Sequence, residues 1–204
     1  MKKLLIAVAA AATLAAPQAF AQAKNFEGFS VLGGLNFANN TSEITSTVFN
    51  GSASESSQNL GLQAQYNFAL GQSFVLGVGA SLGLGESKAG VLNTGSASVA
   101  VKVTESSSVY IAPGFAATPT LLVYGKLASL NGKVEAKNTS STAPTTQNLS
   151  GVGYGAGVQS YLSKNLFAQV EVMQNNYNDR SFTALSETDK SKATVLSIGV
   201  GYKF

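Results

Sequence analysis

The sequence has 204 residues, of which 45% are hydrophobic and 11% charged, with a formal net charge of +3 and neither cysteine nor histidine. Soluble domains usually have about a quarter of their residues charged, so Gly, Ser, Thr, Asn and Gln supply most of the polarity here. The lack of cysteine excludes disulfides and thiolate metal sites, and the lack of histidine excludes Ser-His-Asp catalysis and imidazole metal ligands.

The N-terminus has the pattern of a secretory signal peptide. Met1-Lys2-Lys3 is basic, residues 4–16 are apolar, and Ala19-Phe20-Ala21 fits the small-x-small cleavage pattern. The apolar stretch is shorter than the ~20 residues that a transmembrane helix needs. We therefore predict a signal peptide over residues 1–21 and one domain over residues 22–204. Without Lys2 and Lys3 the net charge falls from +3 to +1, and the other lysines are scattered, so no nucleic-acid partner is expected.

After residue 21 the chain alternates apolar residues with small or polar ones, which is the pattern of amphipathic β-strands. The clearest case is residues 59–70. There Leu60, Leu62, Ala64, Tyr66, Phe68 and Leu70 alternate with Gly61, Gln63, Gln65, Asn67 and Ala69. We expect strands over residues 28–38, 59–70, 74–85, 105–115, 121–133, 149–162, 166–176 and 193–204. No helical periodicity follows the signal peptide.

The connections between these strands alternate in length. Tight turns are expected at 71–73, 117–120 and 163–165, and long loops rich in Ser, Thr, Asn and Lys at 39–58, 86–104, 134–148 and 177–192. Short periplasmic turns and long extracellular loops are typical of outer-membrane barrels. The sequence therefore predicts an all-β fold, an eight-stranded antiparallel up-and-down transmembrane β-barrel in the bacterial outer membrane, with both termini in the periplasm. A soluble β-sandwich would not explain the signal peptide, the alternation of loop lengths and the terminal Phe204 together.

Aromatic residues collect near the turns on the lipid-facing parity, where we expect a membrane girdle: Tyr66, Phe68, Phe74, Phe115, Tyr202 and Phe204. Two residues fit the barrel less easily. Glu105 shares the lipid-facing parity and is expected at the outer rim. Pro113 lacks a backbone donor in a strand without a free edge, so we expect it to mark a bulge.

Three stretches carry a family resemblance: V-Y-I-A-P-G-F-A-A-T-P-T-L-L-V-Y-G-K-L from Val109, G-V-G-Y-G-A-G-V from Gly151, and the ending G-Y-K-F. They resemble the small eight-stranded outer-membrane barrels typified by the outer-membrane protein A transmembrane domain and the outer-membrane protein X group. The resemblance implies that the barrel-assembly machinery, with periplasmic chaperones, reads the ending that contains Tyr202 and Phe204. It also implies contact with outer-membrane lipid and lipopolysaccharide. Because nothing follows Phe204, the periplasmic peptidoglycan-binding domain of outer-membrane protein A is not expected.

The inward parity of the strands carries the candidate site: Gln63, Gln65, Tyr124, Lys126, Gln169 and Glu171. Lys126 and Glu171 are the inward charges of opposite sign in mid-strand, and each would be costly to bury unpaired. We therefore predict that they approach across the lumen. They form either a gate, resembling the lumenal ion pairs of the family, or a structural polar core, which we favour.

These features favour a non-enzymatic barrel that serves envelope integrity or surface interaction through its loops, where an external ligand could bind. The alternative is a narrow porin-like channel for ions or small solutes. A lipid-modifying enzyme is disfavoured because histidine is absent. No cofactor or metal is expected, since Asp179, Glu187 and Asp189 match no ligand spacing and the glycine runs lack the features of a phosphate-binding loop.

Overall fold

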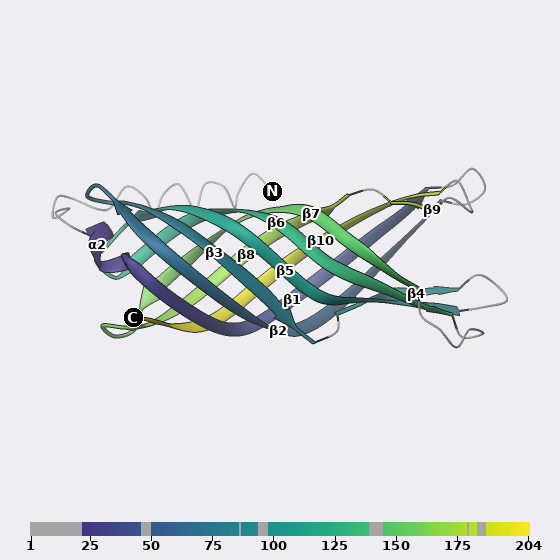
Figure 1. Ribbon diagram of the computed structural model, residues 1–204, viewed down its shortest axis with the longest axis horizontal. Coiled ribbons are helices and arrows are strands. Elements are labelled where there is room, and N and C mark those ends of the chain that lie inside the picture. Colours follow the sequence, from purple (N-terminus) through teal and green to yellow (C-terminus); the bar gives the residue numbers. More distant parts are fainter. Residues whose placement is uncertain are drawn as a thin grey trace, which may run out of the picture.

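The alternating stretches form long β-strands that close into a barrel (Figure 1). The structure is a computed structural model and describes residues 22–45, 50–85, 87–93, 98–138, 145–178, 180–182 and 187–204. The signal peptide predicted over residues 1–21 lies outside this range. The elements are α2 (Gln22–Phe26), β1 (Gly28–Thr45), β2 (Asn50–Leu70), β3 (Phe74–Leu84), β4 (Ser87–Asn93), β5 (Ser98–Ala116), β6 (Leu121–Asn138), β7 (Thr145–Tyr161), β8 (Leu166–Tyr177), β9 (Arg180–Phe182) and β10 (Glu187–Lys203).

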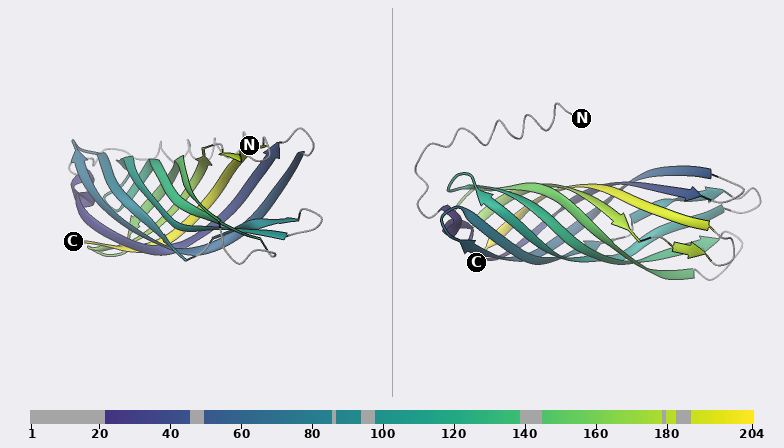
Figure 2. Two further views of the ribbon diagram at one scale, coloured as in Figure 1. Left: turned by 45° about the vertical axis from the view of Figure 1, so that its right-hand side comes forward. Right: turned by 90° about the horizontal axis from the view of Figure 1, so that it is seen from above.

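Neighbouring strands pair antiparallel in the order β1-β2-β3-β5-β6-β7-β8-β10, and β10 returns to pair with β1. The closing ladder runs from Ser30 opposite Lys203 to Thr45 opposite Thr188. The short strands β4 and β9 continue β3 and β8 along the wall, where they pair with β5 and β10. The ten strands thus occupy eight positions round the wall, and the predicted eight-stranded antiparallel barrel is confirmed. Figure 2 shows the strands inclined to the long axis, as closure of a barrel requires.

The two ends of the barrel differ. One end, which we call the turn end, carries the short connections at 71–73, 117–120 and 162–165 together with α2 and Phe204 (Figure 1). The other, which we call the hairpin end, carries the β1–β2, β4–β5, β6–β7 and β9–β10 hairpins. No helix among the described residues is long and apolar enough to cross a membrane.

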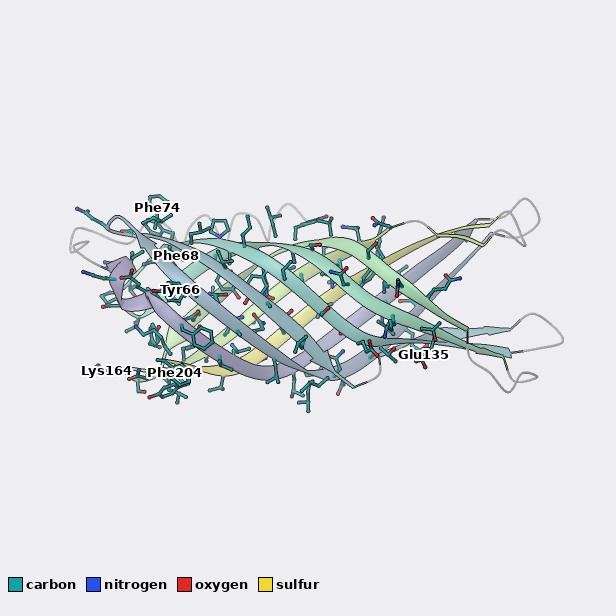
Figure 3. All side chains as sticks on the ribbon, viewed as in Figure 1. Tyr66, Phe68, Phe74, Glu135, Lys164 and Phe204 are labelled. Carbon is teal, nitrogen blue, oxygen red and sulfur yellow. The ribbon has the colours of Figure 1, made fainter. Side chains whose placement is uncertain are left out.

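The outer face of the wall is apolar. Large side chains such as Leu35, Val109 and Ile198 are about half exposed on it, although each lies in the middle of a paired strand. Such a continuous apolar surface needs an apolar surrounding. The predicted girdle residues Tyr66, Phe68, Phe74, Phe115, Tyr202 and Phe204 all lie exposed on this face. Figure 3 shows Tyr66, Phe68, Phe74 and Phe204 at the turn end.

The predicted long loops are wrong over most of their length, because the strands continue into them. β1 and β2 pair as far as Thr45 opposite Asn50, and β6 and β7 as far as Ala136 opposite Thr145. These outer stretches are rich in Ser, Thr and Asn on both parities. The alternation of apolar and polar residues ends where the wall leaves the lipid. Strands in water can still pair through their backbones without an apolar face, so the sequence pattern did not predict these outer parts of the strands. The predicted loop segments at 46–49, 94–97, 139–144 and 183–186 lie outside the described residues.

The bulge predicted at Pro113 is also wrong. On either side of Pro113, Ile111 pairs with Leu127 and Gly114 with Tyr124, so no residue is inserted there. The register shift in β5 lies instead between Thr104 and Ser107, where Glu105 has a φ of 52°. Glu105 is exposed and its carboxylate lies 2.6 Å from Lys133 Nζ. Proline removes one donor without lengthening the strand, whereas a left-handed residue changes the strand's course.

Candidate functional site

The middle of the lumen holds a buried ion pair between β6 and β8. Lys126 Nζ lies 2.9 Å from Glu171 Oε1 and 3.1 Å from Glu171 Oε2, and the two side chains are 4% and 3% exposed. The predicted contact is therefore present, but it does not span the lumen. Only β7 separates β6 from β8, and the two side chains meet on the lumen side of β7. On β7, Gly155 pairs with Lys126 and Gly157 with Glu171.

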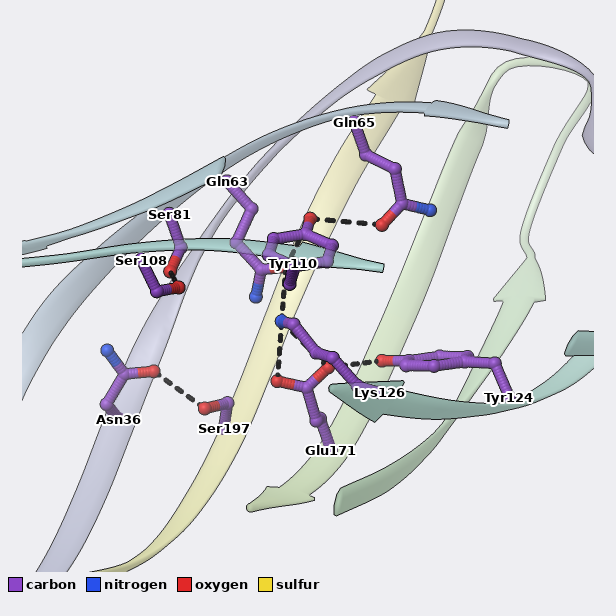
Figure 4. A network of polar contacts seen from close by, with 10 residues as sticks. All are labelled: Asn36, Gln63, Gln65, Ser81, Ser108, Tyr110, Tyr124, Lys126, Glu171 and Ser197. Carbon is purple, nitrogen blue, oxygen red and sulfur yellow. Dashed lines mark hydrogen bonds and ion pairs between the residues drawn. The ribbon is translucent and has the colours of Figure 1, made fainter. Parts of the chain in front are cut away.

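Hydrogen bonds connect the ion pair to the opposite wall (Figure 4). The Tyr124 hydroxyl donates to Glu171 Oε2 at 2.8 Å, and Lys126 Nζ donates to Gln63 Oε1 at 3.2 Å. The Tyr110 hydroxyl donates to Gln65 Oε1 at 3.0 Å, and Lys126 Nζ lies 3.8 Å from the centre of the Tyr110 ring. Side chains from β2, β5, β6 and β8 thus form one polar layer across the barrel. Both ions have partners, so the layer carries no net charge.

Five of the six predicted lumen residues belong to this layer: Gln63, Gln65, Tyr124, Lys126 and Glu171. The sixth, Gln169, is buried beside Glu171 on the same face of β8 and lines the adjoining cavity. Tyr110 joins the layer but was not among the candidates for a gate. The alternation in the sequence predicts that Tyr110 points inward. Its contact with Lys126 depends on how the strands are staggered, which the alternation does not give.

Glycines make room for the two tyrosines of the layer. A Cβ atom at Gly157 would overlap the Tyr124 hydroxyl, and one at Gly79 would overlap the Tyr110 ring. The interior of an eight-stranded barrel is only just wide enough for side chains. A bulky inward side chain therefore needs a neighbouring residue without a side chain, which is glycine. This explains why glycine recurs on the inward parity.

A short helix that the sequence analysis did not predict covers the turn end. α2 has five residues, and its Phe26 is completely buried among apolar side chains of the barrel interior, including Val75, Ala116 and Leu122. The Phe26 ring lies 5.2 Å from that of Tyr161, which in turn meets Phe167 edge-on at 5.9 Å. We call this group the turn-end cluster. It fills the lumen between α2 and the polar layer.

Polar contacts with three parts of the rim hold α2 in place. The backbone amide of Ala23 donates to the Gln72 carbonyl at 3.0 Å, and Asn25 Nδ2 donates to the Pro119 carbonyl at 3.1 Å. Lys203 Nζ donates to the Asn25 carbonyl at 2.6 Å. Gly28, with a φ of 124°, then lets the chain turn into β1. The helix is therefore a plug that is anchored to two turns and to the last strand.

A cavity of about 160 Å³ occupies the other half of the lumen, between the polar layer and the hairpin end. It is not enclosed, and its lining reaches Asn40 on β1 and Tyr177 on β8. Asn36, Asn59 and Ser197 line it and form a hydrogen-bonded chain: Ser197 donates to Asn36 at 2.8 Å and Asn36 to Asn59 at 2.9 Å. Ser81 and Ser108 pair at 2.7 Å in the same region.

The carboxylate in the middle of the lumen is fully paired. Glu171 is held by Lys126 and Tyr124, and the described residues contain no group of three His, Cys, Asp or Glu side chains that could hold a metal ion. The arrangement can bind or exclude solutes.

Comparison with known proteins identifies relatives of the fold. The sequence matches the family model described as outer membrane protein beta-barrel domain over residues 6–204. No curated protein matches the sequence. Among solved structures, Ail, the attachment invasion locus protein of Yersinia pestis, is similar with a TM-score of 0.51 and 18% identity, over 87% of this chain and 99% of that one.

Two further structures resemble this one. Neisserial surface protein A has a TM-score of 0.51 and 17% identity, covering 87% of this chain and 98% of its own. A major outer membrane protein from Thermus thermophilus has a TM-score of 0.50 and 12% identity, covering 83% of this chain and 99% of its own. At such identities the likeness concerns the fold alone.

We expect removal of one partner of the ion pair to destabilise the barrel more than removal of both. Lys126→Met leaves the Glu171 carboxylate buried without its cation, which typically costs about 3–5 kcal/mol. The double variant Lys126→Met with Glu171→Leu should recover most of this, because apolar replacement of a whole buried pair is often neutral. Urea unfolding in phospholipid vesicles measures the free energies. A double variant whose cost equals the sum of the two single variants would contradict coupling of the pair.

We expect the plug to shield the turn-end cluster from solvent. The chain has no cysteine, so Ala116→Cys places a single thiol in this cluster, where Ala116 is 1% exposed. A polar maleimide should label it slowly, and Phe26→Ala should speed labelling by roughly tenfold or more by weakening the local closed state. Phe26→Leu, which keeps an apolar anchor, is the matched control. Equal labelling rates in all three backgrounds would show that α2 does not seal the mouth.

Proposed function

This chain belongs to the outer membrane protein β-barrel family, and on that premise we propose that it is a non-enzymatic barrel serving envelope integrity or surface interaction. Its hairpins would carry the contacts with the outside, including any external ligand. The proposal rests chiefly on one observation, which is the filled lumen. The polar layer, the turn-end cluster and α2 lie one behind another along the barrel axis.

The orientation is part of the proposal. Short turns face the periplasm in barrels of this kind, so the turn end with α2 and Phe204 would face inward. The hairpin end would then project from the cell. A signal peptide over residues 1–21 would deliver the chain to the periplasm. Chaperones there and the barrel-assembly machinery would read the last strand, in which the Phe204 amide donates to the Phe29 carbonyl at 2.9 Å.

A non-enzymatic role is supported by what the described side chains offer. The buried carboxylate is neutralised by Lys126, and the other buried polar side chains carry amides, a hydroxyl and phenols. The hairpins, by contrast, extend the wall well past its apolar part, and the β1–β2 and β6–β7 hairpins are rich in Ser, Thr and Asn. These extended hairpins therefore favour a role in surface contact.

A narrow channel is the second candidate. It is favoured by the polar layer and by the polar side chains, such as Asn36, Asn59 and Ser197, that line part of the cavity. Conduction would require α2 to leave the mouth and the turn-end cluster to rearrange as well.

Planar-bilayer recording of the refolded protein separates the two candidates. We expect no conductance steps from the native chain, because the buried side chains block the lumen. The variant Lys126→Leu should be equally silent. Steady steps from the native protein that change with Lys126→Leu would contradict the proposal and favour the channel.

Trimming a hairpin tests the surface role. Replacing residues 42–53 by Asn-Gly joins Thr41 to Ser54, which are register partners, through a two-residue turn that suits hairpins. In cells that lack the native protein, we expect the trimmed barrel to restore resistance to detergent but not attachment to host matrix or phage. Slower migration of boiled than of unboiled samples on a gel confirms folding. Cells in which complete loss of the protein changes neither property would refute the proposal.

A further inference from the structure

The cavity at the hairpin end has the chemistry of a binding site that the proposed function does not use. We propose that it binds one small neutral polyhydroxylated solute, such as a single hexose unit, and we call it the cup. The floor, the walls and the size of the cup each support this assignment.

The floor is closed and electrically neutral. Lys126 and Glu171 are the charged residues of the lining, and they neutralise each other at 2.9 Å. Beneath them the turn-end cluster and α2 fill the lumen. A solute that enters the cup therefore stops there. An anion or a cation would have to displace one partner of the ion pair to find a counter-charge, which is costly at a buried site.

The walls combine donors and acceptors on the same side chains. Asn36, Asn59 and Ser197 come from β1, β2 and β10, and their mutual hydrogen bonds hold them in place before any ligand arrives. An amide or hydroxyl that makes one such bond keeps further donor or acceptor capacity. Adjacent hydroxyls on a sugar ring also donate and accept at once, so they match this mixture better than a carboxylate, which only accepts.

Aliphatic side chains complete the lining. Ala128 and Leu130 from β6, Leu149 from β7 and Val195 from β10 border the same cavity. A sugar ring offers C–H surface between its hydroxyls, and this surface gains from contact with apolar groups. The combination disfavours a purely ionic ligand and also a purely apolar one, which would leave the amides unpaired.

The volume sets the size of the solute. A cavity of about 150 Å³ can accommodate one six-membered ring such as benzene. The cavity here, at about 160 Å³, therefore has room for one sugar ring. A larger saccharide would have to extend toward the hairpins.

The test is an NMR titration of the ¹⁵N-labelled refolded barrel with glucose, in a zwitterionic detergent that carries no sugar headgroup. We expect saturable shifts of the Asn36 and Asn59 side-chain amides, with a dissociation constant in the millimolar range. Glucuronate, which has the same ring with a carboxylate, should bind roughly tenfold more weakly or worse. Shifts that do not saturate, that lie on the outer face, or that are equal for glucuronate would overturn the proposal.

A pair of variants locates the site. Ala38 is buried and lines the cup, so Ala38→Phe should fill it and abolish the shifts. Ala80 is exposed on the outer face of β3, so Ala80→Phe adds the same bulk toward lipid and should leave binding unchanged. Binding that survives in folded Ala38→Phe overturns the assignment. If that variant does not fold, Ser197→Val takes its place and should weaken binding several-fold. None of these outcomes bears on the surface role of the hairpins.

Discussion

The ladder between β1 and β10 is the contact on which the rest of the structure depends. A backbone N–H or C=O that faces lipid without a partner costs several kcal/mol, so an open sheet edge cannot lie in the hydrocarbon. Leu35 and Ile198 are partners in this ladder and both present their side chains to the outside. The pairing continues to the end of the chain, where the Phe204 amide reaches the Phe29 carbonyl. The apolar outer face is stable only because the wall has no edge.

Closure with eight strand positions then determines what the interior can hold. The lumen is too narrow to stay empty, and the strands that line it supply an apolar group at one end and polar groups in the middle. Gly79 and Gly157 allow Tyr110 and Tyr124 to lie across the barrel, and Lys126 with Glu171 lies between them. α2 completes the apolar end. Apolar side chains surround Phe26 of α2 at the turn end, polar side chains meet in the middle, and both kinds line the cavity beyond them.

Residue parity was sufficient to predict the wall and the contact between Lys126 and Glu171. The predicted up-and-down order already puts one strand between them. Parity could not show that the glycines of this strand, β7, leave room for the two side chains to meet. The outer parts of β1 and β2 escaped prediction because a ladder in water needs no apolar face. α2 escaped because five residues are too few to show a helical period, and its stability comes from burying Phe26 rather than from its own sequence.

The outer hairpins also determine how freely the chain can vary in length. A shift of one residue would turn every side chain of a strand to the other face of the wall. Residues added or removed as opposed pairs at a hairpin tip preserve the register below it, since Thr41 stays opposite Ser54 whatever follows. The hairpin end can therefore lengthen, shorten or change its residues over generations without disturbing the part in lipid. The ladder between β1 and β2 thus lets the hairpin vary while the strands in lipid keep their register.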